Sequence, residues 1–177
     1  PIPNSKYKVL NLIPRKPMRN GGLSETPFDD TPGRLNTIRS GMPTIANTGI
    51  PILSSTLAGA VQTHTGRDRD SIKINRISNT FGIAFESEPL DKQLKIRGVP
   101  QVKINITPSR KNTEIIAYLY DVNKYGRGRL ITYAPLSLHE YSDPQPTAGQ
   151  PMDVTINLLT QAYNVPKGHR IALVFDT

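Results

Sequence analysis

The sequence predicts a mostly β protein, either a sandwich or a barrel. Short segments with an apolar residue at every second position recur along the chain, and this period of two is typical of a strand with one buried face. Clusters of Gly, Pro, Asn and Asp separate these segments and predict turns. Helical spacing of apolar residues never continues beyond two turns, and the short segment Ser54–Val61 is a weak helix candidate.

The expected strands differ in how much of each is buried. Residues 115–122 are apolar on both faces, which is typical of a central strand covered on both sides. Residues 171–175 predict another buried strand directly before the end of the chain. Loss of a following strand would leave an open edge, and the sequence therefore suggests a truncation at the C-terminus. Six further strands are expected: Tyr7–Ile13, Ile72–Phe85 with an interruption, Leu94–Gly98, Val102–Thr107, Leu130–Ala134 and Val154–Leu158.

The length of 177 residues predicts a single domain. Residues 1–80 are expected to form a lead-in rich in Pro and Gly together with the first strands, because eight of the 16 prolines lie in residues 1–51. Residues 81–177 are expected to carry the core strands. The clearest internal boundary is the change at residue 52, after which no proline occurs until residue 89.

The net charge of +8 raises the question of an anionic partner, and its distribution is uneven. Residues 1–78 hold 11 basic and five acidic groups, or +6, and residues 79–177 hold 11 and nine, or +2. The densest basic cluster is Arg15 and Lys16 with Arg19, and no stretch holds five basic residues together. We therefore interpret the charge as a solvated surface, and nucleic acid is not an expected partner.

Three classes of protein are excluded by composition. Without Cys there is no disulfide framework and no thiolate metal site, and the redox compartment stays undetermined. The apolar runs are too short to span a bilayer, so no membrane partner is expected. The first residues, Pro1 to Asn4, lack the charged and apolar regions of a signal peptide.

The three histidines are the candidates for acid–base or metal chemistry. His64 lies near Asp68 and Asp70 and could act as a base with an orienting carboxylate, although a polar surface loop explains the same residues. His139 and Glu140 fall short of the roughly three or four ligands that a metal site needs. His169 precedes the last strand, where it is expected to satisfy backbone groups.

Signatures of a nucleophile or of a phosphate loop are absent. The sequence contains no Gly-x-Ser-x-Gly and no Gly-x-x-x-x-Gly-Lys. The run Gly126–Arg129 could suggest a phosphate-binding or RNA-binding element, but its place between two strands favours a hairpin turn. We therefore expect no catalytic, cofactor-binding or metal-binding residue and no cofactor in this chain.

Aromatic side chains leave a sugar-binding function open. The chain has seven Tyr and no Trp, although Trp is the usual stacking platform for a sugar ring. Tyr125, Tyr133, Tyr141 and Tyr163 lie in or near expected loops and could replace it.

The order of motifs in the second half of the chain resembles the C-terminal non-catalytic domain of the X-Pro dipeptidyl-peptidase and cocaine-esterase-like serine hydrolases (the CocE/NonD family). The resemblance covers roughly residues 83–175, and residues 1–80 match only loosely. The segments that carry it are Leu94–Gly98, Val102–Ile106, Ala117–Val122 with its Leu-x-Asp-Val ending, Gly126 and Gly128, Leu130–Thr132, Pro146–Pro151, Val154–Leu158 and the turn Pro166–Leu173 with its Gly-His-Arg.

The resemblance implies a jelly-roll β-sandwich that is similar to galactose-binding domains. It also implies a parent serine hydrolase that removes X-Pro dipeptides from N-termini or cleaves related esters and amides. The serine, the acid and the histidine of such enzymes belong to a preceding α/β-hydrolase domain, which would be the partner of this chain. A homo-oligomer and, for a dipeptidyl-peptidase, a cytoplasmic location are further implications.

Two alternatives come from other classes of protein. One is a stand-alone jelly-roll module that binds carbohydrate or another ligand through its loop tyrosines. The other is a capsid-like jelly roll with a basic arm, which the +6 charge of residues 1–78 suggests and which would bind nucleic acid in a salt-dependent manner.

Overall fold

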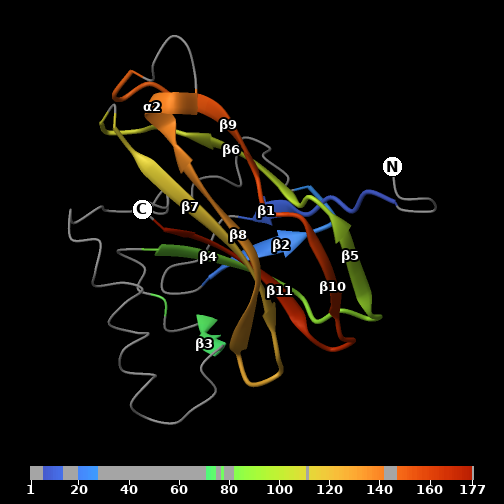
Figure 1. Cartoon of the computed structure of the whole chain (residues 1–177). Coiled ribbons are helices and arrows are strands. Elements are labelled where there is room, and N and C mark those ends of the chain that lie inside the picture. Colours follow the sequence, from blue (N-terminus) through green and yellow to red (C-terminus); the bar gives the residue numbers. More distant parts are fainter. Residues whose placement is uncertain are drawn as a thin grey trace.

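The computed structural model describes residues 6–13, 20–27, 71–74, 77, 82–110, 112–141 and 147–176. The described part is mostly β, as the sequence predicts, with little helix, and it forms no closed barrel (Figure 1). The helix candidate Ser54–Val61, the basic cluster of Arg15, Lys16 and Arg19, and His64 lie outside the described residues.

The main sheet has seven described strands in the order β1-β2-β4-β11-β7-β8-β3. All neighbours in this sheet run antiparallel except β2 and β4, which are parallel. The strands are β1 (Asn11–Ile13), β2 (Gly21–Ser24), β3 (Ser71–Lys73), β4 (Gly82–Ser87), β7 (Glu114–Val122), β8 (Arg127–Ser137) and β11 (Arg170–Asp176).

The last strand of the chain lies in the middle of this sheet. β11 pairs with β4 on one side and with β7 on the other, so that Leu173 lies opposite both Phe85 and Leu119. The prediction of a buried strand at residues 171–175 is confirmed, and neither edge of β11 is left unpaired. β7 also has a neighbour on each side, as expected of a central strand.

The remaining strands form a two-stranded ribbon. β5 (Leu94–Gly98) pairs with β10 (Gln161–Val165), and β6 (Gln101–Ile106) pairs with β9 (Met152–Asn157). Gly98 lies opposite Gln161 and Gln101 lies opposite Asn157, so one extra residue enters the strand that β9 and β10 form. The Leu158 N–H donates to the Pro100 carbonyl at 2.9 Å across this irregular step. We call β5, β6, β9 and β10 the ribbon.

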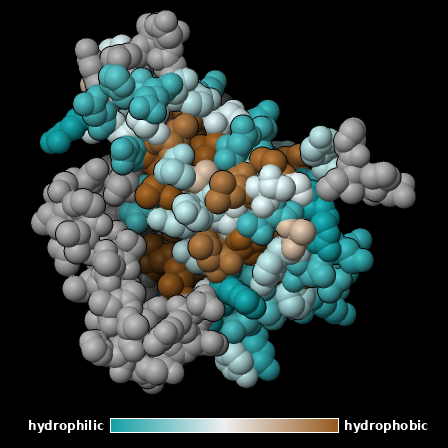
Figure 2. Space-filling model, viewed as in Figure 1, coloured by the Kyte–Doolittle hydropathy of each residue, from teal (hydrophilic) through white to brown (hydrophobic). Residues whose placement is uncertain are grey.

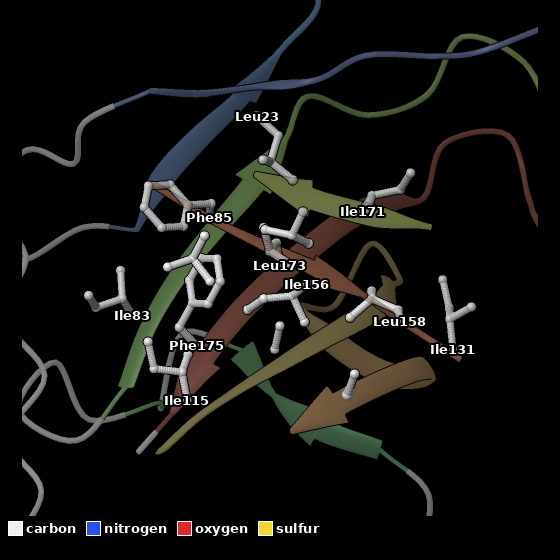
Figure 3. Packing of buried hydrophobic residues seen from close by; sticks show 14 of the residues in the cluster. Leu23, Ile83, Phe85, Ile115, Ile131, Ile156, Leu158, Ile171, Leu173 and Phe175 are labelled. Atoms are coloured by element: carbon white, nitrogen blue, oxygen red, sulfur yellow. The ribbon is translucent and has the colours of Figure 1, made fainter. Parts of the chain in front are cut away.

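The ribbon and the main sheet share one hydrophobic core. Phe85, Leu173 and Phe175 of the sheet belong to the same buried cluster as Ile156 and Leu158, which come from β9 and the residue after it (Figure 3). The Phe85 and Phe175 rings meet edge to face, with their centroids 6.2 Å apart. Burial of each such side chain contributes about 1.5–3 kcal/mol to the free energy of unfolding, so this core is the main link between the two layers.

The opposite face of the sheet carries a second, smaller cluster. Its buried members are Ile74, Ala84, Val122, Ala172 and Val174. Because residues alternate between faces along a strand, Leu173 belongs to the large core and Val174 to the small one. This explains why β11 has an unbroken apolar sequence. Figure 2 shows hydrophobic side chains at the surface in the middle of the face that Figure 1 presents, where β8 and β11 cross.

Two strands were not predicted from the sequence. We expected Gly21 and Gly22 to break the chain, but they begin β2. A Cβ at Gly21 would lie 2.3 Å from the Phe85 Cδ1 atom, so the absence of a side chain is what lets β2 pack against β4. β10 was missed because the residues on its more buried face are Gln161, Tyr163 and Val165, which do not form a series of apolar residues.

Three expected elements have different limits in the structure. The strand predicted for Tyr7–Ile13 contains only Asn11–Ile13. The interrupted segment predicted for Ile72–Phe85 contains two described strands, Ser71–Lys73 and Gly82–Ser87. The region around His139, which we expected to be a loop, contains the short helix α2 (Leu138–Tyr141). The strands expected at 94–98, 102–107, 115–122, 130–134 and 154–158 are present with ends that differ by a few residues.

Candidate functional site

The clearest polar cluster in the described residues surrounds the carboxylate of Asp121. Asp121 is the eighth residue of β7, and its side chain is only 7% exposed. The Tyr163 hydroxyl donates a hydrogen bond to Oδ2 at 2.9 Å, and His169 Nδ1 lies 2.7 Å from Oδ1. Tyr163 belongs to β10 of the ribbon and His169 to the turn before β11. One carboxylate therefore joins three segments of the chain.

The electrostatics of this cluster favour the neutral form of the tyrosine. Burial raises the pKa of Tyr163, the hydrogen bond to the Asp121 carboxylate raises it further, and the nearby charge of Arg129 opposes both effects. A hydroxyl that stays protonated remains a donor to Asp121. The arrangement suits a structural role in which Asp121 holds β7, β10 and the turn before β11 together, because each carboxylate oxygen already has a partner.

The neighbouring Ser87 is bound to the backbone and makes no catalytic triad with this pair. Its hydroxyl donates to the Glu88 carbonyl at 2.8 Å and accepts from the Ile171 N–H at 2.9 Å. A triad needs a hydrogen bond between the serine and the histidine. Among the described residues, His169 has no such bond with Ser87, so the serine fixes the start of β11 to the end of β4.

Two of the three candidate histidines, His139 and His169, lie in the described residues. His169 was expected to satisfy backbone groups, but its ring contacts Asp121, and its carbonyl accepts from the Leu90 N–H at 2.8 Å. His139 lies on α2, and His64 lies outside the described residues. No group of three or more potential metal ligands occurs among the described residues.

The glycine–arginine run forms the predicted hairpin. Gly126 has a φ of 71° and lies between β7 and β8, where the Gly126 N–H donates to the Asn123 carbonyl at 2.9 Å. Gly128 pairs with Val122 inside the sheet, and its lack of a side chain makes room for the fully buried Ile74. The backbone groups of this run are thus used for the turn and the strand pairing.

Of the four tyrosines expected in or near loops, Tyr125 lies in the β7–β8 turn, whereas the other three lie in regular elements: Tyr133 in β8, Tyr141 in α2 and Tyr163 in β10. Their side chains also differ in exposure. Tyr163 is bound to Asp121, and the Tyr141 hydroxyl accepts from the Thr155 N–H at 2.8 Å. Tyr125 and Tyr133 are 72% and 42% exposed. Tyr133 stacks on Tyr118 of the neighbouring strand, with centroids 6.0 Å apart. The hypothesis of a shared sugar platform is therefore limited to two tyrosines that are exposed.

Comparison with known families agrees with the resemblance seen in the sequence. The model of the X-Pro dipeptidyl-peptidase C-terminal non-catalytic domain matches residues 3–177. The chain belongs to this family. The match includes residues 3–80, which the sequence motifs had related to it only loosely. None of the helices in the described ranges is long and apolar enough to cross a membrane.

The solved structures that match part of this chain are much longer chains. An alpha-amino acid ester hydrolase is 25% identical over 54% of this chain, with a TM-score of 0.47. An aminopeptidase from a marine sediment archaeon (Thaumarchaeota archaeon) is 16% identical over 65%, with a TM-score of 0.49, and a CocE/NonD family hydrolase from Staphylococcus aureus is 13% identical over 54%, with a TM-score of 0.47. The matches cover 18%, 19% and 22% of those chains. No curated protein matches the sequence.

The structure relates two motifs of the X-Pro dipeptidyl-peptidase C-terminal domain that are far apart in the sequence. The Leu-x-Asp-Val motif supplies Asp121, and the Gly-His-Arg turn supplies His169, 48 residues later. Sequence reasoning found both motifs but gave no sign that they contact each other. The signal that could have suggested it is the aspartate itself, because a carboxylate in an apolar strand needs hydrogen-bond donors from elsewhere.

Proposed function

We propose that this chain is the non-catalytic C-terminal domain of a serine hydrolase of the X-Pro dipeptidyl-peptidase type, and that it packs on an α/β-hydrolase domain of the same protein. The observation that carries the proposal is the family match over residues 3–177. The parent enzyme would remove X-Pro dipeptides from N-termini or cleave an ester or amide of similar size. The domain would form one wall of the entrance to the active site and contribute contacts in a homo-oligomer.

The described residues support a structural role for this chain. A catalytic serine must be free to attack a substrate, whereas Ser87 holds two backbone groups and lies in the interior. Asp121 and His169 form the only close pair of an acid and a histidine in the described ranges, and Tyr163 shares the carboxylate. No residue of the chain is therefore proposed as catalytic, and no cofactor is proposed.

We further propose that the two layers correspond to a jelly-roll sandwich formed by a single domain. The seven-stranded sheet and the ribbon share the large core, which is the packing expected of two sheets of a sandwich. Residues 1–80 would supply the lead-in and the first strands, and residues 81–177 the core strands.

The test compares the isolated chain with its parent protein on a chromogenic X-Pro substrate. We expect no turnover by the chain alone and turnover by the parent, with loss of activity after treatment with a serine-directed inhibitor. The parent is expected to carry a Gly-x-Ser-x-Gly-like nucleophile motif upstream of this chain. Inhibitor-sensitive turnover by the isolated chain would overturn the non-catalytic assignment, and an inactive parent would overturn the proposed enzyme class.

A further inference from the structure

The end of the β7–β8 hairpin carries a group of basic side chains. Lys124, Arg127 and Arg129 lie within six residues, and Lys73 of β3 lies opposite Arg127. The hairpin end projects at the bottom of Figure 1, and the same region is hydrophilic in Figure 2. We call Lys73, Lys124, Tyr125, Arg127 and Arg129 the basic hairpin surface.

The strand register places three of these cations on one face of the sheet. Arg127 and Arg129 are two residues apart on β8, and Lys73 lies opposite Arg127. Asp121 lies opposite Arg129 on the same face, but its two carboxylate oxygens are bound to Tyr163 and His169. Within the described ranges, Lys73, Lys124 and Arg129 take part in no ion pair.

The cations of this surface that remain without an ion pair in the described ranges are Lys73, Lys124 and Arg129. An anionic partner would gain electrostatic attraction from these three side chains. The charge pattern therefore indicates a surface that fits an anionic partner.

The hairpin end is held in a fixed shape before any partner binds. Asn123 Oδ1 accepts from the Tyr125 N–H at 2.9 Å and from the Arg127 N–H at 3.1 Å, and the Ile74 N–H donates to the Gly126 carbonyl at 3.2 Å. Tyr125 is 72% exposed at the tip of this rigid turn. A preorganised surface loses little conformational entropy on binding, which favours affinity.

The chemistry of the tip favours a polypeptide over a nucleic acid. Lys124 Nζ lies 5.0 Å from the centroid of the Tyr125 ring and so covers one face on which a base would stack. Single-stranded nucleic acids are usually held by a basic groove with several aromatic platforms. The described hairpin end offers one tyrosine and a narrow group of cations, and an exposed tyrosine beside basic residues is typical of protein interfaces.

We propose that the basic hairpin surface docks an acidic polypeptide surface, with Tyr125 as its central contact. Carboxylates of the partner would lie against Lys73, Lys124 and Arg129, and the Tyr125 side chain would be buried in the contact. This proposal does not depend on the class of the parent enzyme. It concerns only the charge and shape of this part of the fold.

The test measures binding of a fluorescein-labelled polyglutamate peptide to the full chain by fluorescence anisotropy at low salt. The triple variant K73A/K124A/R129A is compared with K92A/K95A/K103A, which removes the same charge from exposed lysines on and beside the ribbon. We expect the hairpin variant to bind about tenfold more weakly, because three exposed ion pairs of ordinary strength are lost, and the ribbon variant to bind like the wild type. Y125A is expected to weaken binding as well.

Three results would overturn the proposal. Equal weakening of binding by both triple variants would show that only the net charge matters. Absence of polyglutamate binding at low salt would show that the surface does not bind an acidic polypeptide. Tighter binding of a single-stranded oligothymidylate, lost in the hairpin variant, would assign the surface to nucleic acid. Circular dichroism checks that the variants are folded. If the triple variant does not fold, K124A and Y125A test the same surface, because both residues lie in the turn outside the strands.

Discussion

At the scale of single residues, the buried carboxylate of Asp121 is expected to be the most sensitive polar group of the described chain. Asp121→Ala removes the acceptor of the Tyr163 hydroxyl and the partner of His169 Nδ1. Because both partners then lose a charge-assisted hydrogen bond to a buried carboxylate, we expect a loss of about 2–4 kcal/mol in the free energy of unfolding. Urea denaturation measures this loss.

The matched control for this change is Asp153→Ala on the ribbon. Asp153 Oδ1 accepts a hydrogen bond from Asn105 at 2.8 Å, but both side chains are exposed there, so its loss is expected to cost less than about 0.5 kcal/mol. Asp121→Asn keeps the shape and one acceptor oxygen, and its cost should fall between these two. If Asp121→Ala lowers the free energy of unfolding as little as the control does, the hydrogen bonds of Asp121 do not have the structural role that we assign to them.

A second residue-scale prediction concerns the pH dependence of stability. Burial raises the pKa of Tyr120 from its usual 10.0 to about 12, with smaller contributions from Tyr118 and Asp176. The unfolded chain therefore releases this proton at a lower pH than the folded chain does. The contribution of Tyr120 to the free energy of unfolding is fully present below pH 10 and is lost as the pH rises from 10 toward about 12.

The measurement is the free energy of unfolding at several pH values across this window, together with ultraviolet titration of the phenolates. Tyr120→Phe has no proton to release, so its stability should fall less steeply between pH 10 and 12 than that of the wild type. Some decline remains in the variant because burial also raises the pKa of Tyr118 and of Tyr163. Parallel declines in both proteins would contradict the prediction.

At this scale the sequence could identify residues but not their contacts. The pattern around Asp121 and the turn containing His169 were both recognised, and the contact between them spans 48 residues. Such a contact depends on the order of strands in the sheet, because β11 must lie beside β7 before the two side chains can meet. Local periodicity contains no information about that order.

At the scale of elements, the attachment of β3 to the sheet depends on the missing side chain of Gly128. A Cβ there would lie 2.6 Å from the Ile74 Cδ1 atom and 2.9 Å from its Cγ1 atom, and Ile74 is fully buried. Gly128→Ala is therefore expected to lower the free energy of unfolding by about 1–3 kcal/mol, because the added methyl group overpacks the site. Thermal or urea unfolding measures the loss.

A double-mutant cycle separates this contact from any effect of the backbone. Ile74→Val removes the Cδ1 atom that lies closest to the added methyl group. We expect the double variant Gly128→Ala/Ile74→Val to be more stable than the sum of the two single changes predicts. Simple additivity would mean that the cost at Gly128 comes from the strand backbone rather than from Ile74.

Elements with period-two apolar patterns were predictable, and elements made by unusual residues were not. β6, β7 and β9 were identified because, apart from Asp121, their buried positions are occupied by Val, Ile and Ala. β2 was missed because two glycines normally signal a turn, whereas here one of them permits contact with Phe85. Packing against a distant ring decides the structure of that segment, and no local signal reports it.

At the scale of the whole molecule, the sequence supported the β class but left the layers open. The ribbon arises because β5 and β6 run against β9 and β10, whose paired residues lie 46 to 71 positions later in the sequence. Pairing over such distances follows from the global topology rather than from local propensity. A central position for β11 could likewise not be derived from its apolar sequence, although its burial could.

The shared core predicts that the sheet and the ribbon unfold as one cooperative unit. In native-state hydrogen exchange, the slowest amides should belong to β11 and β7, which pair on both sides, and the short edge strands β1 and β3 should exchange faster. Leu158→Ala removes a side chain that is 3% exposed and lies after β9, at an expected cost of about 2–5 kcal/mol. If the layers are coupled, this change should reduce protection in β11 as much as in β9. Loss of protection confined to the ribbon would show instead that the two layers open separately, and that the large core does not couple them.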